Sequence, residues 1–136
     1  MAITSATVLT LLIAWALLLV VLMEILRGRL VAGGHIAGNE FRPDNSNLSP
    51  FMQRLARAHA NCIEGLPIFG GLLVVALVTN RASVTDQLAP WLLLARLVQS
   101  GTHLSSGSIL AVNVRFLAFV VQLVIALYWS WALLVR

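Results

Sequence analysis

The sequence contains little charge, no lysine and a single cysteine. Only 10% of its 136 residues are charged, and all nine basic residues are arginine. One cysteine excludes an internal disulfide. The low charge, beside 60% hydrophobic residues and a mean hydropathy of +0.92, excludes an ordinary water-soluble domain, because such a domain needs a far more polar surface. We therefore expect the chain to lie in a lipid bilayer.

The excess of arginine over acidic residues does not indicate a nucleic-acid partner. The sequence pI is about 11.1, yet the arginines are scattered singly along the chain instead of forming a basic patch. We expect neither a nucleic acid nor a metal ion among the ligands.

Four apolar stretches predict four membrane-spanning helices. The first and the last are each long enough to cross the roughly 30 Å of hydrocarbon in a bilayer. The later breaks between stretches are short, which favours antiparallel neighbours. The expected spans are 3–26, 51–79, 86–105 and 112–135, with a polar loop at 27–50. The predicted fold is an all-α integral membrane protein, an antiparallel four-helix transmembrane bundle in a single domain, 1–136.

The distribution of arginine predicts how the chain sits in the membrane. Because the more positive side of a membrane protein faces the cytoplasm, we expect both termini on the non-cytoplasmic side. The arginines near the span ends on the expected cytoplasmic side are Arg27, Arg29, Arg42, Arg54, Arg57 and Arg115, against Arg81 and Arg136 on the other side.

A polar stripe at the start of the second span is the clearest functional signal. If this segment is helical, Arg57, Asn61 and Glu64 fall at positions i, i+4 and i+7 and share one face, with Arg54 one turn earlier. A cation, an amide and a carboxylate are thereby predicted to converge.

The third span carries a second polar stripe, formed by Arg96, Gln99, Ser100 and His103 at helical spacing. An ionisable group inside a membrane costs several kcal/mol unless it faces a partner or a polar cavity, so we expect the charges of both stripes to surround one site. Internal pairing of Glu64 with Arg57 or Arg96, for structure alone, is the alternative.

The surplus of guanidinium groups over carboxylates favours an anionic ligand. Arginine binds carboxylates and phosphates through paired hydrogen bonds and cannot neutralise itself by losing a proton. In a small zwitterionic peptide, Glu64 would bind the amine, Arg57 and Arg54 the carboxylates, and Asn61 an amide.

These residues resemble the pattern of the MAPEG family, the membrane-associated proteins in eicosanoid and glutathione metabolism. The resemblance covers nearly the whole chain and implies a bacterial-type homotrimer of four-helix subunits. It also implies glutathione as co-substrate, bound between neighbouring subunits at sites open to the cytoplasmic side of a bacterial inner membrane. The motif residues are Arg54, Arg57-Ala58-His59, Asn61, Glu64, Pro67 and Phe69, followed by Ala95-Arg96.

The resemblance also implies which residues bind glutathione. First-loop arginines stand at the mouth of the site in this family, and the remaining binding residues come from the second and third helices. The implied set is Arg54, Arg57, Asn61, Glu64, Arg96, Gln99, Arg27 and Arg29.

Two departures from the family pattern concern the glutathione thiol. His103 and Gln99 stand where family members have tyrosines, and Arg115 lies farther from Arg96 than the family's thiolate-activating arginine. Arg115 and His103 are the candidates for the catalytic residues that stabilise the thiolate. For Arg115, extension toward the membrane interface is the alternative role.

The predicted function is therefore that of a membrane-bound glutathione transferase or peroxidase that attacks hydrophobic electrophiles or lipid hydroperoxides. A non-catalytic lipid-binding or scaffold trimer of the same family is the alternative. A small transporter is disfavoured, because the sequence offers no repeated half and no continuous polar path.

Overall fold

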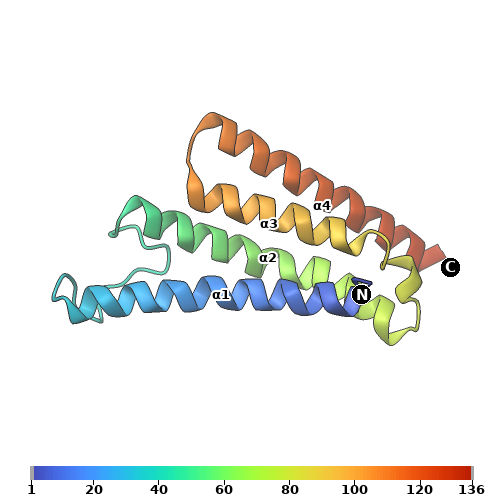
Figure 1. Ribbon diagram of the computed structural model, residues 1–136, viewed down its shortest axis with the longest axis horizontal. Helices are drawn as coiled ribbons and strands as arrows, with labels where there is room; N and C mark the ends of the chain where they lie inside the picture. The colour runs from blue at the N-terminus through green and yellow to red at the C-terminus, as the bar shows by residue number, and fades with distance from the viewer. Residues whose placement is uncertain (1, 136) are drawn as a thin grey trace.

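The computed structural model describes residues 2–135, so Arg136 lies outside the described part of the chain (Figure 1). These residues form α-helices and one short 3-10 helix, without a β-strand, which confirms the predicted all-helical class. The elements are α1 (Ser5–Ala32), α2 (Pro50–Val78), η1 (Ala82–Val84), α3 (Ala89–Ser105) and α4 (Ile109–Val135). Both chain ends and the α2–α3 connection lie at one end of the bundle, and the other two connections lie at the opposite end (Figure 1).

Three of the four long helices have the length and apolar composition needed to cross a membrane, namely α1, α2 and α4. The third, α3, has 17 residues. At 1.5 Å per residue it measures roughly 25 Å, which is shorter than the roughly 30 Å hydrocarbon layer. The expectation of four full spans is thus supported for three helices only, and α3 carries the buried polar stripe instead of a continuous apolar surface.

The first helix is longer than the sequence indicated. It runs to Ala32, so Arg27 and Arg29 belong to its last turns and the connecting loop covers 33–49. The guanidinium of Arg27 donates to Glu24, one turn earlier in the helix, at 3.1 Å. The helix ends where Gly34 adopts a φ of 72°, a conformation that glycine reaches without strain.

A buried asparagine holds this loop against the bundle. The Oδ1 atom of Asn45 accepts hydrogen bonds from Nε and Nη2 of Arg27, at 3.1 and 2.6 Å. Its Nδ2 atom donates to the carbonyl of Met52 in the first turn of α2, at 2.8 Å. Asn45 has a φ of 55°, which asparagine tolerates better than most residues. The end of α1 and the start of α2 are therefore joined through one side chain.

Two groups of buried apolar side chains form the core. One group, which includes Leu73, Leu92 and Trp129, draws on all four helices. The other packs α1 against the first half of α2 and includes Leu19 and Leu55. Most remaining apolar side chains on α1 and α4 face outward, as expected for helices whose solvent is lipid.

Arginine closes the end of the last helix. Arg81, between α2 and η1, donates from Nη1 to the carbonyl of Leu133 and from Nη2 to that of Ala132, both at 2.7 Å. The last carbonyls of a helix have no partner within the helix, and a cation beside them is also favoured by the helix dipole. Arg81 therefore fastens the end of α4 to the α2–η1 connection.

The Arg81→Met substitution should lower the free energy of unfolding by about 1–3 kcal/mol, because hydrogen bonds to a charged group are lost. Unfolding of the purified protein in mixed detergent, followed by circular dichroism, measures the change. Arg29→Met is the matched control, because Arg29 is exposed on α1. Equal stability of the two variants would contradict the capping role.

Candidate functional site

Arg96 is the centre of the polar site. Its side chain leaves α3 toward α2 and is only 3% exposed. Nη1 donates to the carbonyl and to the Oδ1 of Asn61, at 3.3 and 3.4 Å. The guanidinium also lies over the ring of Phe69, with 5.5 Å between its central carbon and the ring centroid. A buried cation is thus held by one carbonyl, one amide and one aromatic face.

Gly65 makes room for this guanidinium. A Cβ atom at this position would collide with Nη2 of Arg96 and would lie 3.0 Å from the Phe69 ring. Asn61, Gly65 and Phe69 follow one another at intervals of four residues, so they form one face of α2. The sequence analysis did not assign Gly65 to the site, and this four-residue spacing before a buried arginine is the signal that could have found it.

The polar contacts continue from Asn61 to α4. The Nδ2 atom of Asn61 lies 3.3 Å from Nε2 of His103, and Nδ1 of His103 lies 2.9 Å from Nη1 of Arg115. These contacts form one continuous polar network across α2, α3 and α4, made of Arg96, Asn61, His103 and Arg115. The sequence analysis named all four residues as candidates, and the structure brings these four together.

This polar network contains more hydrogen-bond donors than acceptors. Arginine has no acceptor, so Nδ1 of His103 must accept from Arg115, and Nε2 of a neutral ring then carries the proton. Nε2 meets the amide nitrogen of Asn61, which is also a donor. The other end of that amide, Oδ1, faces the Arg96 guanidinium. Exchanging the nitrogen and oxygen of the Asn61 amide would only move the clash between two donors from His103 to Arg96, so the polar network lacks one acceptor.

Arg57 and Glu64 do not belong to this polar network. Both are exposed, whereas Arg96 is buried. At 100° per residue, Arg57 lies roughly 100° around α2 from the buried face, and Asn61 lies between them. We expected one pocket surrounded by Arg57, Glu64 and Arg96, and a single copy of the polypeptide does not form it. Glu64 also pairs with neither arginine, since Arg27–Glu24 is the only ion pair within residues 2–135.

Two of the three remaining arginines of the expected set, Arg54 and Arg27, bind protein groups. Nε of Arg54 donates to the carbonyl of Leu104, at 3.1 Å, in the last turn of α3. Arg27 binds Glu24 and the loop, and Arg29 is exposed on α1. Of these three residues, only Arg54 reaches the helix that carries Arg96 and His103.

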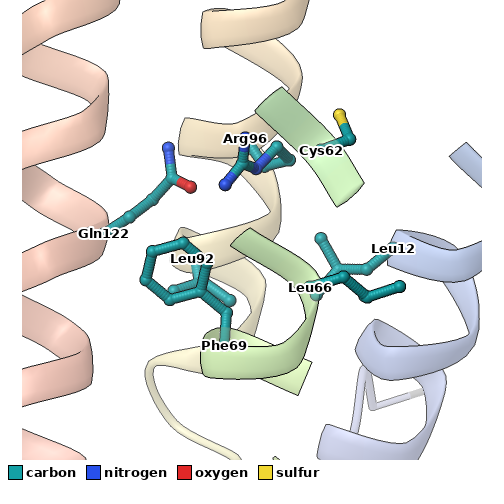
Figure 2. Close-up of a pocket in the computed structure, with 7 residues that line it drawn as sticks. All are labelled: Leu12, Cys62, Leu66, Phe69, Leu92, Arg96 and Gln122. Atoms are coloured by element: carbon teal, nitrogen blue, oxygen red, sulfur yellow. The ribbon is translucent and has the colours of Figure 1, made fainter. Parts of the chain in front are cut away.

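Gln99 is buried and turns toward α4, where its Oε1 accepts a hydrogen bond from Nε2 of Gln122, at 2.8 Å. Gln122 was not among the sequence candidates, although a glutamine inside an apolar run is a signal of a buried polar partner. Figure 2 shows Gln122 and Arg96 facing one pocket from opposite helices. Within residues 2–135 no cluster of His, Cys, Asp or Glu side chains is arranged to hold a metal ion.

Comparison with protein families matches residues 5–135 to the MAPEG family. The comparison with curated proteins found no match, and neither did the comparison with solved structures. Because the match spans nearly the entire chain, this protein belongs to the MAPEG family. Together with three helices able to cross a bilayer, the match identifies an integral membrane protein.

Gly65→Ala should destabilise the protein by about 1–3 kcal/mol, because the added methyl group displaces the Arg96 guanidinium from Asn61 and Phe69. Gly71→Ala, in the same helix with open space around it, should be neutral or stabilising by up to about 1 kcal/mol. The free energy of unfolding in detergent measures both. A cost for Gly65→Ala that persists undiminished in an Arg96→Met background would show that the arginine is not the group displaced.

Proposed function

We propose that this protein is a membrane-bound glutathione-dependent transferase or peroxidase. The observation that carries the proposal is the polar network that links Arg96 to Arg115, which has cationic donors at both ends and one acceptor too few. An anion bound beside it would supply that acceptor. A thiolate is such an anion, and the family is one of glutathione metabolism.

The thiolate is proposed to bind beside Arg115 and His103. A free thiol is only a few per cent thiolate at pH 7, and the thiolate is the nucleophile. Lowering the pKa of the thiol by about two units requires roughly 2.7 kcal/mol of preferential stabilisation of the anion. One guanidinium and one further donor in a partly dehydrated site can provide that amount. The sulfur would then form a carbon–sulfur bond with a hydrophobic electrophile from the bilayer, whose leaving group departs with the bonding electron pair. With a lipid hydroperoxide, two glutathione molecules would be oxidised to their disulfide while the hydroperoxide is reduced to the alcohol and water.

The rest of the tripeptide is proposed to bind where Arg57 and Glu64 are exposed. These two charges lie on a helix that is apolar enough to cross a membrane, and an uncovered charge there is costly. A homotrimer would cover them, because a neighbouring subunit and the ligand close the site from outside. Glu64 would bind the amine of glutathione and Arg57 a carboxylate, with Asn61 joining this outer part to Arg96.

The proposed membrane orientation follows from the ends of the bundle. The loop that carries Arg42 and the α3–α4 connection, near Arg115, lie at the same end, where α1 finishes with Arg27 and Arg29 (Figure 1). The more positive end is proposed to face the cytoplasm of a bacterial inner membrane, with antiparallel helices, both termini outside and the site open to the cytoplasm.

A non-catalytic lipid-binding or scaffold trimer is the second candidate. One observation favours it: Arg115 already binds His103, at 2.9 Å, and His103 and Gln99 stand where the family pattern has tyrosines. The two functions differ in whether the protein converts bound glutathione into its thiolate.

Arg115→Met should abolish thiolate formation while leaving glutathione binding within about tenfold of the starting protein, because the substitution removes the charge that stabilises the anion. Stopped-flow mixing of the detergent-purified trimer with glutathione measures thiolate absorbance, and equilibrium dialysis measures binding. Arg42→Met, in the exposed loop, is the matched control. Binding without any thiolate signal in the unsubstituted protein would indicate the scaffold, and no binding at millimolar glutathione would refute the proposal.

Glu64→Gln and Arg57→Met should each weaken glutathione binding by about tenfold to a hundredfold, since each removes a hydrogen bond to a charged group. Glu64→Gln keeps the side-chain shape, so the loss reports on charge. Light scattering after gel filtration checks that the assembly is unchanged. Unaltered affinity in both variants, with assembly intact, would place the tripeptide elsewhere.

A further inference from the structure

Four buried side-chain atoms have no hydrogen-bond partner within residues 2–135: the indole nitrogens of Trp15 and Trp129, and two atoms that line one pocket between the helices. One of the two pocket atoms is Nη2 of Arg96, a donor, and the other is Oε1 of Gln122, an acceptor. The two residues are 3% and 0% exposed. Leaving such atoms unsatisfied in a low-dielectric interior costs free energy, so each calls for a partner.

The orientation of the Gln122 amide is set by its other contacts. Nε2 donates to Oε1 of Gln99 at 2.8 Å and to the carbonyl of Ala118 at 3.1 Å. Reversing the amide would place an oxygen against two acceptors. The oxygen therefore points away from Gln99, and Figure 2 shows it directed toward the guanidinium of Arg96.

Both orphaned groups line the same small pocket, together with Cys62, Phe69 and Leu92. The pocket offers about 10 Å³ to the centre of a water molecule. A void of this order holds about one water and nothing larger.

We propose that this pocket is an internal water site. The water accepts a hydrogen bond from Nη2 of Arg96 and donates one to Oε1 of Gln122, which satisfies both atoms. A halide is excluded by its greater size and by the amide oxygen, whose negative end would repel it. This inference uses no part of the proposed glutathione chemistry.

The water makes Gln122 a positioning residue for Arg96. The water joins the Gln99–Gln122 pair to the polar network that runs from Arg96 through Asn61 to Arg115. With Nη2 held by the water, Nη1 stays directed at Asn61. Helix α4 then contacts the central cation through Gln122 as well as through Arg115.

Hydroxyl-radical X-ray footprinting with mass spectrometry tests the site, because radicals form from water beside buried side chains. Cys62 and Phe69 should be labelled in the full protein although they are only 6% and 3% exposed. Met23, which is 6% exposed in the apolar group between α1 and α2 and has no side-chain nitrogen or oxygen, is the internal control and should remain unlabelled. Exchange into ¹⁸O-water should carry the heavy isotope into the hydroxyl group added to Phe69.

The variant Gln122→Met removes the acceptor while preserving much of the side-chain volume. Labelling of Cys62 and Phe69 should fall by roughly fivefold, the factor expected for one lost hydrogen bond to the water. Labelled Met23 in the variant would reveal misfolding, and the wild-type labelling and isotope result would then decide alone.

Two results would overturn the proposal. Wild-type Cys62 and Phe69 that are labelled no more than Met23 would show a dry cavity. Labelling that changes when chloride is replaced by gluconate would show a bound anion in place of water.

Discussion

The structure depends on finding hydrogen-bond acceptors for guanidinium groups, of which only that of Arg27 pairs with a carboxylate within residues 2–135. Backbone carbonyls supply about half of these acceptors. Arg81 binds the last turn of α4, Arg54 the last turn of α3, and Arg27 the loop that joins α1 to α2. The carbonyls that Arg81 and Arg54 bind lie in the last turns of α4 and α3, where the helix leaves them free, so cation and backbone satisfy each other. In a low-dielectric surrounding this mutual satisfaction places the connections and orders the helix ends.

Arg96 is the case where carbonyls do not suffice. It lies between helices, where α2 offers one carbonyl and one amide oxygen, both from Asn61, and the face of Phe69 over the gap left by Gly65. The same shortage continues to His103, where donors meet donors. A protein that only needed stability would replace such a polar network with apolar side chains at little loss. The missing acceptor beside His103 is the observation that supports the proposal of an anionic ligand.

The fold was largely predictable from the sequence, because apolar runs separated by glycine, proline and asparagine define helices of membrane length. The ends were less predictable. The first helix extends past Arg27, whose side chain contacts Glu24 and Asn45, and hydropathy does not record either interaction. Arg96, Asn61, His103 and Arg115 were named as candidates from the sequence, but neither their contacts nor the part played by Gly65 and Gln122 was predicted. Helical spacing placed Arg57 and Glu64 on one face correctly, but spacing does not say which face another helix covers.

Composition and periodicity by themselves determined that this chain is helical, lies in a membrane and carries two polar stripes, because those properties depend on local spacing and on transfer from water to lipid. Only the tertiary structure decided that Asn61 and Arg96 meet while Arg57 and Glu64 face outward. It also decided that Gln122 lies beside Gln99 and Arg96. The rotation of each helix about its axis made that choice. It is set by how side chains such as Phe69, Leu73 and Trp129 pack between helices, which no single stretch of sequence contains.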